Sequence, residues 1–231
     1  MKKHTGDSYL EIGERYATEV DTRPWNAYYE RPSVLSLLPD IDGKDILDAA
    51  CGSGWYAEYF IGGGAKLTAF DLHLPFVEIT KKRTKGKANV FQADLTAPLS
   101  FSRDGQHDII NCSLALHYLK DWRSTLDEFY RVLQHDGHLV FSTHHPFMDW
   151  DRFKKNNYFA TEMVEDIWDI GKVSFYRRPL GAILESLDSS GFYVEKFLEA
   201  RPVEKLRASD PETFRHLSNN PGFMIVRAKK K

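Results

Sequence analysis

Cysteine and long apolar runs are both scarce in this sequence. Two of its 231 residues are cysteine, Cys51 and Cys112, which is too few for a disulfide framework, so we expect a protein of the reducing cytoplasm. We expect both thiols to be small buried side chains at the ends of neighbouring strands, with a regulatory disulfide as the alternative. No run of about 18 apolar residues occurs, which predicts that no helix crosses a membrane. The charged start, residues 1–7, is followed by no apolar stretch and so does not resemble a signal peptide.

An excess of positive charge is also absent. The chain has 31 Lys and Arg against 33 Asp and Glu, a formal net charge of −2, so it lacks the concentrated basic footprint of a nucleic-acid-binding protein. Its hydrophobic content of 42% is enough for a full core. We therefore expect a single domain over residues 1–231, present as a monomer or a homodimer and acting on a small molecule.

The most informative segment is residues 46–60, which read ILDAACGSGWYAEYF. A short apolar run ends in Asp48, Gly52 and Gly54 follow, and an aromatic-rich segment of helical character comes next. Glycine lets the backbone adopt positive φ and lets a ligand approach without a Cβ in the way. The start of a helix presents free N–H groups to that ligand. The pattern predicts a strand, a tight turn and a helix that bind a cofactor at the carboxyl end of the strand.

Acidic residues close three successive predicted strands. Asp48 ends the first strand, Asp71 ends residues 66–71, and Asp94 ends residues 88–94. A carboxylate at the first position attracts an ammonium group and repels a pyrophosphate. One at the second can accept from both hydroxyls of a ribose, and one at the third can accept from an adenine amine. The three acids together favour a cationic, amine-bearing nucleoside over a dinucleotide.

Four motifs carry a resemblance to a known family: LDAACGSG, TAFD, FQADL and HDIINCSLALHYL. Together they resemble the class I S-adenosylmethionine-dependent methyltransferases, and within them the small-molecule "type 11" group. The resemblance implies S-adenosyl-L-methionine as the cofactor. One departure is that Ala50 and Cys51 stand where Gly-Cys is more usual, and we expect no functional consequence from it.

The resemblance also implies a role for each residue of the cofactor site. Asp48 would bind the methionine amino group, Asp71 the ribose hydroxyls and Asp94 the adenine amine. The remaining expected contacts are backbone groups of Ala50, Gly52 and Gly54 around methionine and ribose, Leu72 and the Leu95 N–H at the adenine, and Ser113 beside the methionine. Arg31 is a further candidate, either as a partner for the methionine carboxylate or as a structural residue at a helix end.

The order of elements predicts the fold. Strands and helices alternate up to a helix over residues 179–189, after which residues 192–198 and 223–227 follow as strands with no crossover helix of adequate length between them. We expect these two to pair antiparallel at one edge of the sheet. The predicted fold is α/β, an open, doubly wound, seven-stranded, mostly parallel sheet with an antiparallel C-terminal edge strand, the Rossmann-like methyltransferase fold.

Two aromatic-rich segments, residues 1–40 and 144–177, lie outside the sheet pattern. They predict a substrate cap over the core, because aromatic faces can enclose a sulfonium and exclude water. The alternative is that these aromatics are only a small core for the cap.

Histidines supply the candidates for a catalytic base. His117 follows the predicted fourth strand, and His144 and His145 follow the fifth. An oxygen or nitrogen acceptor often needs a base with a pKa near neutral, although each histidine could instead be structural. Adjacent histidines point different ways on an extended chain, so we expect no metal site from them.

The predicted function is S-adenosylmethionine-dependent methyl transfer to an unidentified small-molecule acceptor. One alternative is a non-catalytic, cofactor-binding module of the same fold. A NAD-dependent oxidoreductase is a weaker alternative because Asp48 would repel a pyrophosphate. A nucleic-acid methyltransferase is disfavoured by charge and by the absence of an Asn-Pro-Pro-Tyr type motif after the fourth strand, where residues 111–114 read NCSL.

Overall fold

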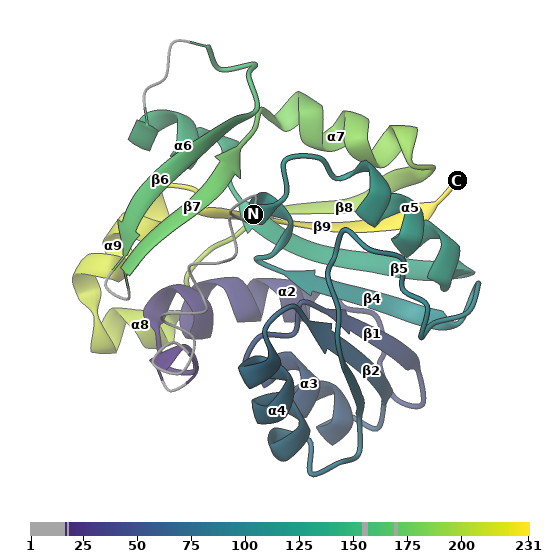
Figure 1. Cartoon of the computed structure of the whole chain (residues 1–231). Helices are drawn as coiled ribbons and strands as arrows, with labels where there is room; N and C mark the ends of the chain where they lie inside the picture. The colour runs from purple at the N-terminus through teal and green to yellow at the C-terminus, as the bar shows by residue number, and fades with distance from the viewer. Residues whose placement is uncertain (1–16, 18, 154–156, 169–170) are drawn as a thin grey trace.

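A seven-stranded sheet forms the centre of the molecule (Figure 1). The computed structural model describes residues 17, 19–153, 157–168 and 171–231. The strand order is β3-β2-β1-β4-β5-β9-β8. The strands are β1 Asp45–Ala49, β2 Lys66–Asp71, β3 Asn89–Gln92, β4 His107–Ser113, β5 Leu133–His144, β8 Phe192–Glu199 and β9 Phe223–Lys230. Strands β1 to β5 pair in parallel, which confirms the predicted open, mostly parallel sheet.

The last two strands pair antiparallel with each other, as the missing crossover helix predicts. The C-terminal strand β9 also pairs antiparallel with β5, so it lies one position inside the edge and β8 is the outermost strand. The segment between them holds two short helices, α8 (Glu204–Ser209) and α9 (Pro211–Asn219). Asp210 caps α9 by accepting a hydrogen bond from the Thr213 N–H.

Helices cover both faces of the sheet because successive strand residues point to opposite sides. Ile46 of β1 belongs to one core cluster and Leu47 to the other. The cluster around Ile46 takes side chains from the helices α2 (Arg31–Leu37), α3 (Trp55–Gly62) and α4 (Leu74–Arg83). The cluster around Leu47 takes side chains from α5 (Arg123–Val132) and α7 (Leu180–Ser189). Both faces of the sheet are therefore covered by helices and shielded from water, as is typical of a parallel sheet.

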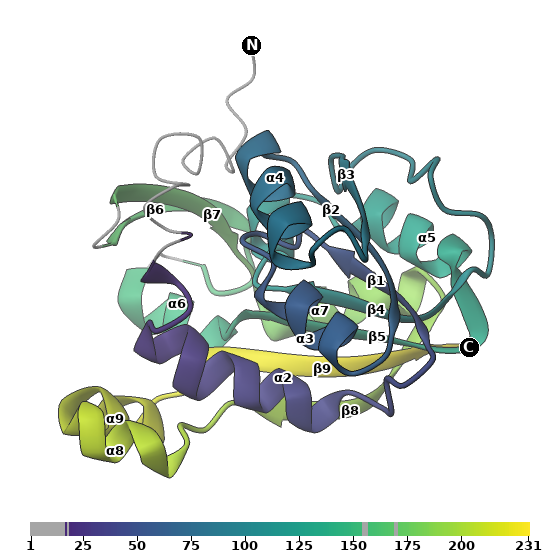
Figure 2. The same cartoon turned by 90° about the horizontal axis from the view of Figure 1, so that it is seen from below.

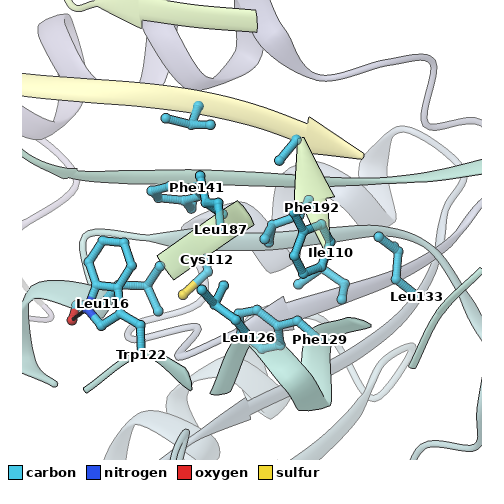
Figure 3. Packing of buried hydrophobic residues seen from close by; sticks show 14 of the residues in the cluster. Ile110, Cys112, Leu116, Trp122, Leu126, Phe129, Leu133, Phe141, Leu187 and Phe192 are labelled. Atoms are coloured by element: carbon cyan, nitrogen blue, oxygen red, sulfur yellow. Dashed lines mark hydrogen bonds between the residues drawn. The ribbon is translucent and has the colours of Figure 1, made fainter. Parts of the chain in front are cut away.

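The second of these clusters shows how the sequence periodicity builds the core (Figure 3). Leu126 and Phe129 of α5 are spaced for one helical face and pack against Ile110 and Cys112 of β4. Cys112 and Cys51 are both buried and both free thiols.

The segment between β5 and α7 forms a separate unit. It contains the helix α6 (Pro146–Phe153) and an antiparallel hairpin of β6 (Glu162–Trp168) and β7 (Gly171–Arg177). Figures 1 and 2 both show the hairpin at the end of the sheet away from the C-terminus. Because β9 runs antiparallel to β5, that end is the carboxyl end of the parallel strands.

The other predicted part of the cap, residues 1–40, is described only from residue 17 onward, without residue 18. Its described part contains the short π-helical turn η2 (Asn26–Glu30), which runs directly into α2. In the part of the chain that the structure describes, no helix is long and apolar enough to cross a membrane.

Ala50, at the end of β1, has a left-handed backbone conformation with φ of +57°. This conformation costs an L-residue about 1–2 kcal/mol, whereas glycine adopts it freely but loses about 0.5–1 kcal/mol of entropy on folding. We predict that Ala50→Gly raises the free energy of unfolding, measured by urea denaturation, by roughly 0.5–1 kcal/mol. The control Ala49→Gly, one residue earlier in the chain, should lower the free energy of unfolding. An equal decrease in the free energy of unfolding of both variants would contradict a strained backbone at Ala50.

Candidate functional site

A cavity of about 700 Å³ opens at the carboxyl ends of the parallel strands, within the size range of small-molecule sites. It brings together most of the residues that the sequence predicts for the site. Those lining it are Arg31, Asp48, Ala50, Gly52, Asp71, Leu72, Asp94, Leu95, Ser113, His117 and His144. Gly54 and His145 do not line it.

The glycine turn between β1 and α3 forms one wall of the cavity. Gly52 has φ of +54°, and a Cβ built on it would meet no atom within 4 Å, so this residue leaves the backbone open to a ligand. Gly54 has φ of +79°, and a Cβ there would lie 2.6 Å from Thr80 Oγ1 of α4. Gly54 therefore serves close packing of the turn against α4, which explains why it lies behind the cavity wall.

Asp71 ties the end of β2 to this turn. Its Oδ2 accepts a hydrogen bond from the Gly52 N–H and its Oδ1 accepts one from the His73 N–H, both at 2.9 Å. Burial raises the pKa of Asp71, and these hydrogen bonds lower it in part. Each carboxylate oxygen can accept a further hydrogen bond, so the Asp71 side chain can receive two hydroxyl groups from the cavity.

Asp48 is a buried carboxylate that lacks a partner on one side. Its Oδ1 accepts from Asn111 Nδ2 at 2.8 Å, whereas its buried Oδ2 has no hydrogen-bond partner among the described residues. Burial raises the pKa of Asp48 to about 7, the Asn111 hydrogen bond lowers it, and the charges of Asp71 and Glu30 raise it further. A cationic donor in the cavity would satisfy the free oxygen and stabilise the ionised form.

Glu30 is a third buried acid at this site, besides Asp48 and Asp71, and the sequence did not predict it. Its Oε1 accepts from Ser142 Oγ at 2.5 Å and its Oε2 from Tyr56 OH at 2.9 Å. Burial raises the pKa of Glu30 and the neighbouring Arg31 lowers it. An acid just before Arg-Pro in an aromatic segment looks like an ordinary helix residue, so no sequence signal marks it. Asn111 gave a usable signal, because it is a polar residue between the apolar residues Ile110 and Cys112 of β4.

Arg31 binds protein groups at the edge of the cavity. Its guanidinium donates to the carbonyl oxygens of Asp21 and Val20 and lies 4.5 Å from the centre of the Trp55 ring. These contacts fix the segment before α2 against the start of α3. They match the structural role that the sequence left open for Arg31.

Asp94 lies at the more exposed end of the cavity, beyond β3. Its Oδ1 accepts from both the Thr96 N–H and Thr96 Oγ1 at 2.8 Å. Leu72 and Leu95 line the cavity near it. This end is partly apolar and partly polar, as a purine site would be.

Two of the three predicted histidines meet at the opposite end of the cavity. His117 lies in the short helix η3 (Leu116–Tyr118) after β4, and His144 ends β5. Their rings stack with centroids 4.1 Å apart and planes 23° apart. His144 Nδ1 lies 3.3 Å from Asp149 Oδ1 of α6. Burial, with His144 and Arg178 nearby, holds the pKa of His117 well below its ordinary value, so this imidazole is neutral.

His145 points into a different environment. Its Nε2 lies 3.1 Å from Glu199 Oε1, and its Nδ1 accepts from the Phe147 N–H at 3.1 Å. Burial lowers its pKa, and Glu199 opposes that shift. In the described residues, no group of three or more His, Cys, Asp or Glu side chains could hold a metal ion.

Comparison with known proteins gives a family-model match and two sequence relatives. Residues 47–141 match the model of a family described as a methyltransferase domain. An uncharacterised protein of Haemophilus influenzae is 26% identical over 230 residues, covering 89% of this chain and 88% of that protein. A malonyl-(acyl-carrier protein) O-methyltransferase of Erwinia billingiae is 32% identical over 101 residues. That match spans 44% of this chain and 39% of the relative, less than half of its length.

A solved structure agrees with these sequence matches. The crystal structure of an S-adenosylmethionine-dependent methyltransferase from Mesorhizobium loti has a TM-score of 0.71 and 24% sequence identity to this chain. It covers 91% of this chain and 100% of its own. At this identity the likeness shows the fold.

The buried Asp48 makes the stability of the empty protein depend on pH. Its pKa is about 7 in the folded state against an ordinary 3.8, so between these values the folded protein holds a proton that the unfolded chain has released. The Asp48 contribution to the free energy of unfolding therefore falls as pH rises from about 4 to 7. We predict that Asp48→Asn flattens this fall and stabilises the ligand-free protein at pH 8 by on the order of 1 kcal/mol or more.

Thermal unfolding at several pH values measures this effect. Asp45→Asn, at the exposed start of the same strand, is the matched control and should keep the wild-type slope. A slope unchanged by Asp48→Asn would show that Asp48 titrates normally.

Proposed function

We propose that the chain transfers a methyl group from S-adenosyl-L-methionine to a small-molecule acceptor. Residues 47–141 match the model of a methyltransferase domain, and the chain shares its fold with a solved S-adenosylmethionine-dependent methyltransferase. The observation that carries the proposal is the pairing of two acids in one cavity. Asp48 offers a buried, unpartnered oxygen to a cation, and Asp71 offers its remaining lone pairs while holding the glycine turn. An ammonium group and a ribose are the two parts of this cofactor that match those acids.

The strand order supports one orientation of the cofactor. Asp94 and Leu95 follow β3, Asp71 ends β2 and Asp48 lies in β1, so these groups follow one another along the sheet edge. In the proposed orientation the adenine lies by Asp94, with the Leu95 N–H and Leu72 beside it, and the ribose by Asp71. The methionine part lies by Asp48 and Ser113, with the backbone of Ala50 and Gly52 around it. Glu30 adds a second negative charge for the ammonium group.

The bound cofactor supplies an electrophilic methyl carbon, and an acceptor lone pair forms the new bond as the carbon–sulfur bond breaks. The protein then has two tasks, alignment and removal of the acceptor proton. We propose that His144 takes this proton, because the Asp149 carboxylate lies 3.3 Å from its Nδ1 and stabilises the charge that forms. His117 packs against the ring of His144 and orients it.

We also propose a cap over the cavity, formed by residues from outside the sheet. Trp25, from the segment before α2, and Trp168 and Phe175, from the hairpin β6/β7, line the cavity from outside the sheet. Apolar rings on this side exclude water from the methyl carbon and the acceptor. We propose that residues 1–40 and 144–177 form this cap, with residues 1–16, 18, 154–156 and 169–170 lying outside the described residues.

The composition supports a cellular location and a class of binding partner. Two free, buried thiols and a net charge of −2 support action in the cytoplasm on a small molecule and no nucleic-acid partner. A monomer or a homodimer would serve this site, because its proposed groups all come from one chain.

Calorimetric titration tests the cofactor directly. We expect micromolar binding of S-adenosylmethionine and of S-adenosylhomocysteine and no binding of NAD. Binding of NAD alone would overturn the proposal, and turnover in an acceptor screen would exclude the non-catalytic module.

Asp71→Ala tests the ribose contact. The substitution should weaken S-adenosylhomocysteine binding by about 1–3 kcal/mol, because two hydroxyl hydrogen bonds are lost. Asp71 also holds the turn by accepting hydrogen bonds on both oxygens. The free energy of unfolding of Asp71→Ala is therefore measured as well, to separate loss of the turn from loss of the ribose contact. Asp127→Ala, on the exposed side of α5, is the control and should bind as wild type does. Unchanged affinity in Asp71→Ala would contradict the assignment.

A further inference from the structure

The cavity continues past the proposed methyl position into a region where both ring nitrogens of the buried His117 have no hydrogen-bond partner among the described residues. We infer that this region binds the methyl acceptor, and that the acceptor is a flat, uncharged ring compound bearing a hydroxyl or ring N–H group. The inference rests on the proposed methyl transfer and adds the chemical class of the acceptor. We call the region, formed by His117, His144, Asp149, Trp168 and Phe175, the acceptor pocket.

The first argument is the number of unpartnered polar atoms. Both ring nitrogens of His117 are buried with no hydrogen-bond partner among the described residues. The Nδ1 of His144 and the Oδ1 of Asp149 are also buried, and they face each other at 3.3 Å without a well-formed hydrogen bond. These residues are 2%, 7% and 3% exposed, and all three line the cavity. Leaving one such atom unsatisfied costs about 1–3 kcal/mol, so a cluster of them indicates a ligand that supplies the missing partners.

The second argument is which partners these atoms require. A neutral imidazole offers one donor and one acceptor, and His117 is kept neutral by burial and by its neighbours His144 and Arg178. The Asp149 carboxylate only accepts. A ligand with an O–H or N–H beside an acceptor atom satisfies this set, and the Asp149 charge would repel a carboxylate or a phosphate.

The third argument is the charge balance of the surrounding residues. Arg152 is the described cation that lines this part of the cavity, and its Nη2 lies 2.6 Å from Asp166 Oδ1. Arg178 lies behind the wall, where it donates to the Leu119 carbonyl and lies over the Trp122 ring. Arg152 is thus paired with Asp166. Arg178 does not line the cavity, although its charge acts on His117 and its Nε has no hydrogen-bond partner among the described residues.

The fourth argument is the shape of the walls. The His117 and His144 rings stack on each other, Tyr118 lies 4.4 Å from His117, and Phe175 meets His144 edge-on with centroids 4.4 Å apart. Trp168 lies 6.2 Å from His144 on the hairpin side. Ring faces and edges of this kind favour a planar guest through offset and edge-to-face contacts.

The fifth argument is position. His117 follows β4 and His144 ends β5, and β4 is the neighbour of β1. The acceptor pocket therefore lies next to the strand end that carries Asp48, beside the proposed methionine part of the cofactor and away from the adenine end. In the transfer step the acceptor O–H or N–H loses its proton to His144 while its lone pair bonds to the methyl carbon.

Matched ring pairs test the acceptor class. We would titrate wild-type protein saturated with S-adenosylhomocysteine with phenol and benzoate, 2-naphthol and 2-naphthoate, and 9-phenanthrol and phenanthrene-9-carboxylate. The hydroxyl compound should bind roughly tenfold more tightly than its carboxylate in at least one pair, and in no pair more weakly. Tighter binding of a carboxylate, or no binding of any hydroxyl compound, overturns the inference. Failure of S-adenosylhomocysteine itself to bind would instead overturn the proposed function.

His117→Phe tests the role of the ring nitrogens. The variant keeps a flat ring and removes both unpartnered nitrogens, so the empty protein should be at least as stable as wild type. Its affinity for the best hydroxyl compound should fall roughly tenfold, with S-adenosylhomocysteine affinity unchanged. His135→Phe, at an exposed position of β5, is the matched control. A variant that is less stable than wild type and binds the hydroxyl compound with unchanged affinity would assign His117 a structural role and contradict the inference.

Discussion

The hydrogen bond from the Gly52 N–H to Asp71 fixes the geometry on which the rest of the site depends. It joins the turn after β1 to the end of β2, and the Cys51 N–H strengthens the link by donating to the Phe70 carbonyl. Thr80 holds the turn from the other side by donating to the Gly52 carbonyl. With the turn fixed in this way, Asp48 and Asp71 face one cavity, and the backbone of Gly52 is open to a ligand.

The buried acids of the site destabilise the ligand-free protein, and the apolar core offsets this loss of stability. Asp48, Glu30 and Asp71 are buried acids with raised pKa values, so the empty cavity concentrates negative potential where a cationic ligand would relieve it. Two apolar clusters on opposite faces of the sheet provide the stability that offsets this cost. With the proposed cofactor contact, stability and cofactor affinity would oppose each other at Asp48, as is common at functional sites.

The cavity has two ends with different chemistry. The end near β1, β2 and β3 presents backbone and carboxylates from the sheet, whereas the end near β5 presents imidazoles and aromatic rings, many from outside it. The separate hairpin β6/β7 contributes to the second end through its own small cluster around Phe175. A fold of this kind can keep its cofactor end and change its acceptor end, because the added segments do not belong to the sheet.

Local patterns in the sequence were enough to determine the strand–turn–helix at Gly52, the acids Asp48 and Asp71 near the ends of β1 and β2, and the antiparallel pairing of β8 with β9, because these depend on neighbouring residues and on chain connectivity. The strand predicted over residues 88–94 ends earlier, at Gln92, so Asp94 lies in the loop after β3. Tertiary structure alone decided the place of β9 between β5 and β8, the burial of Glu30 against Ser142, 112 residues away in sequence, and the stacking of His144 on His117. Each of these depends on which distant side chains pack together. No local pattern encodes that choice, because it is made by the burial of the whole core.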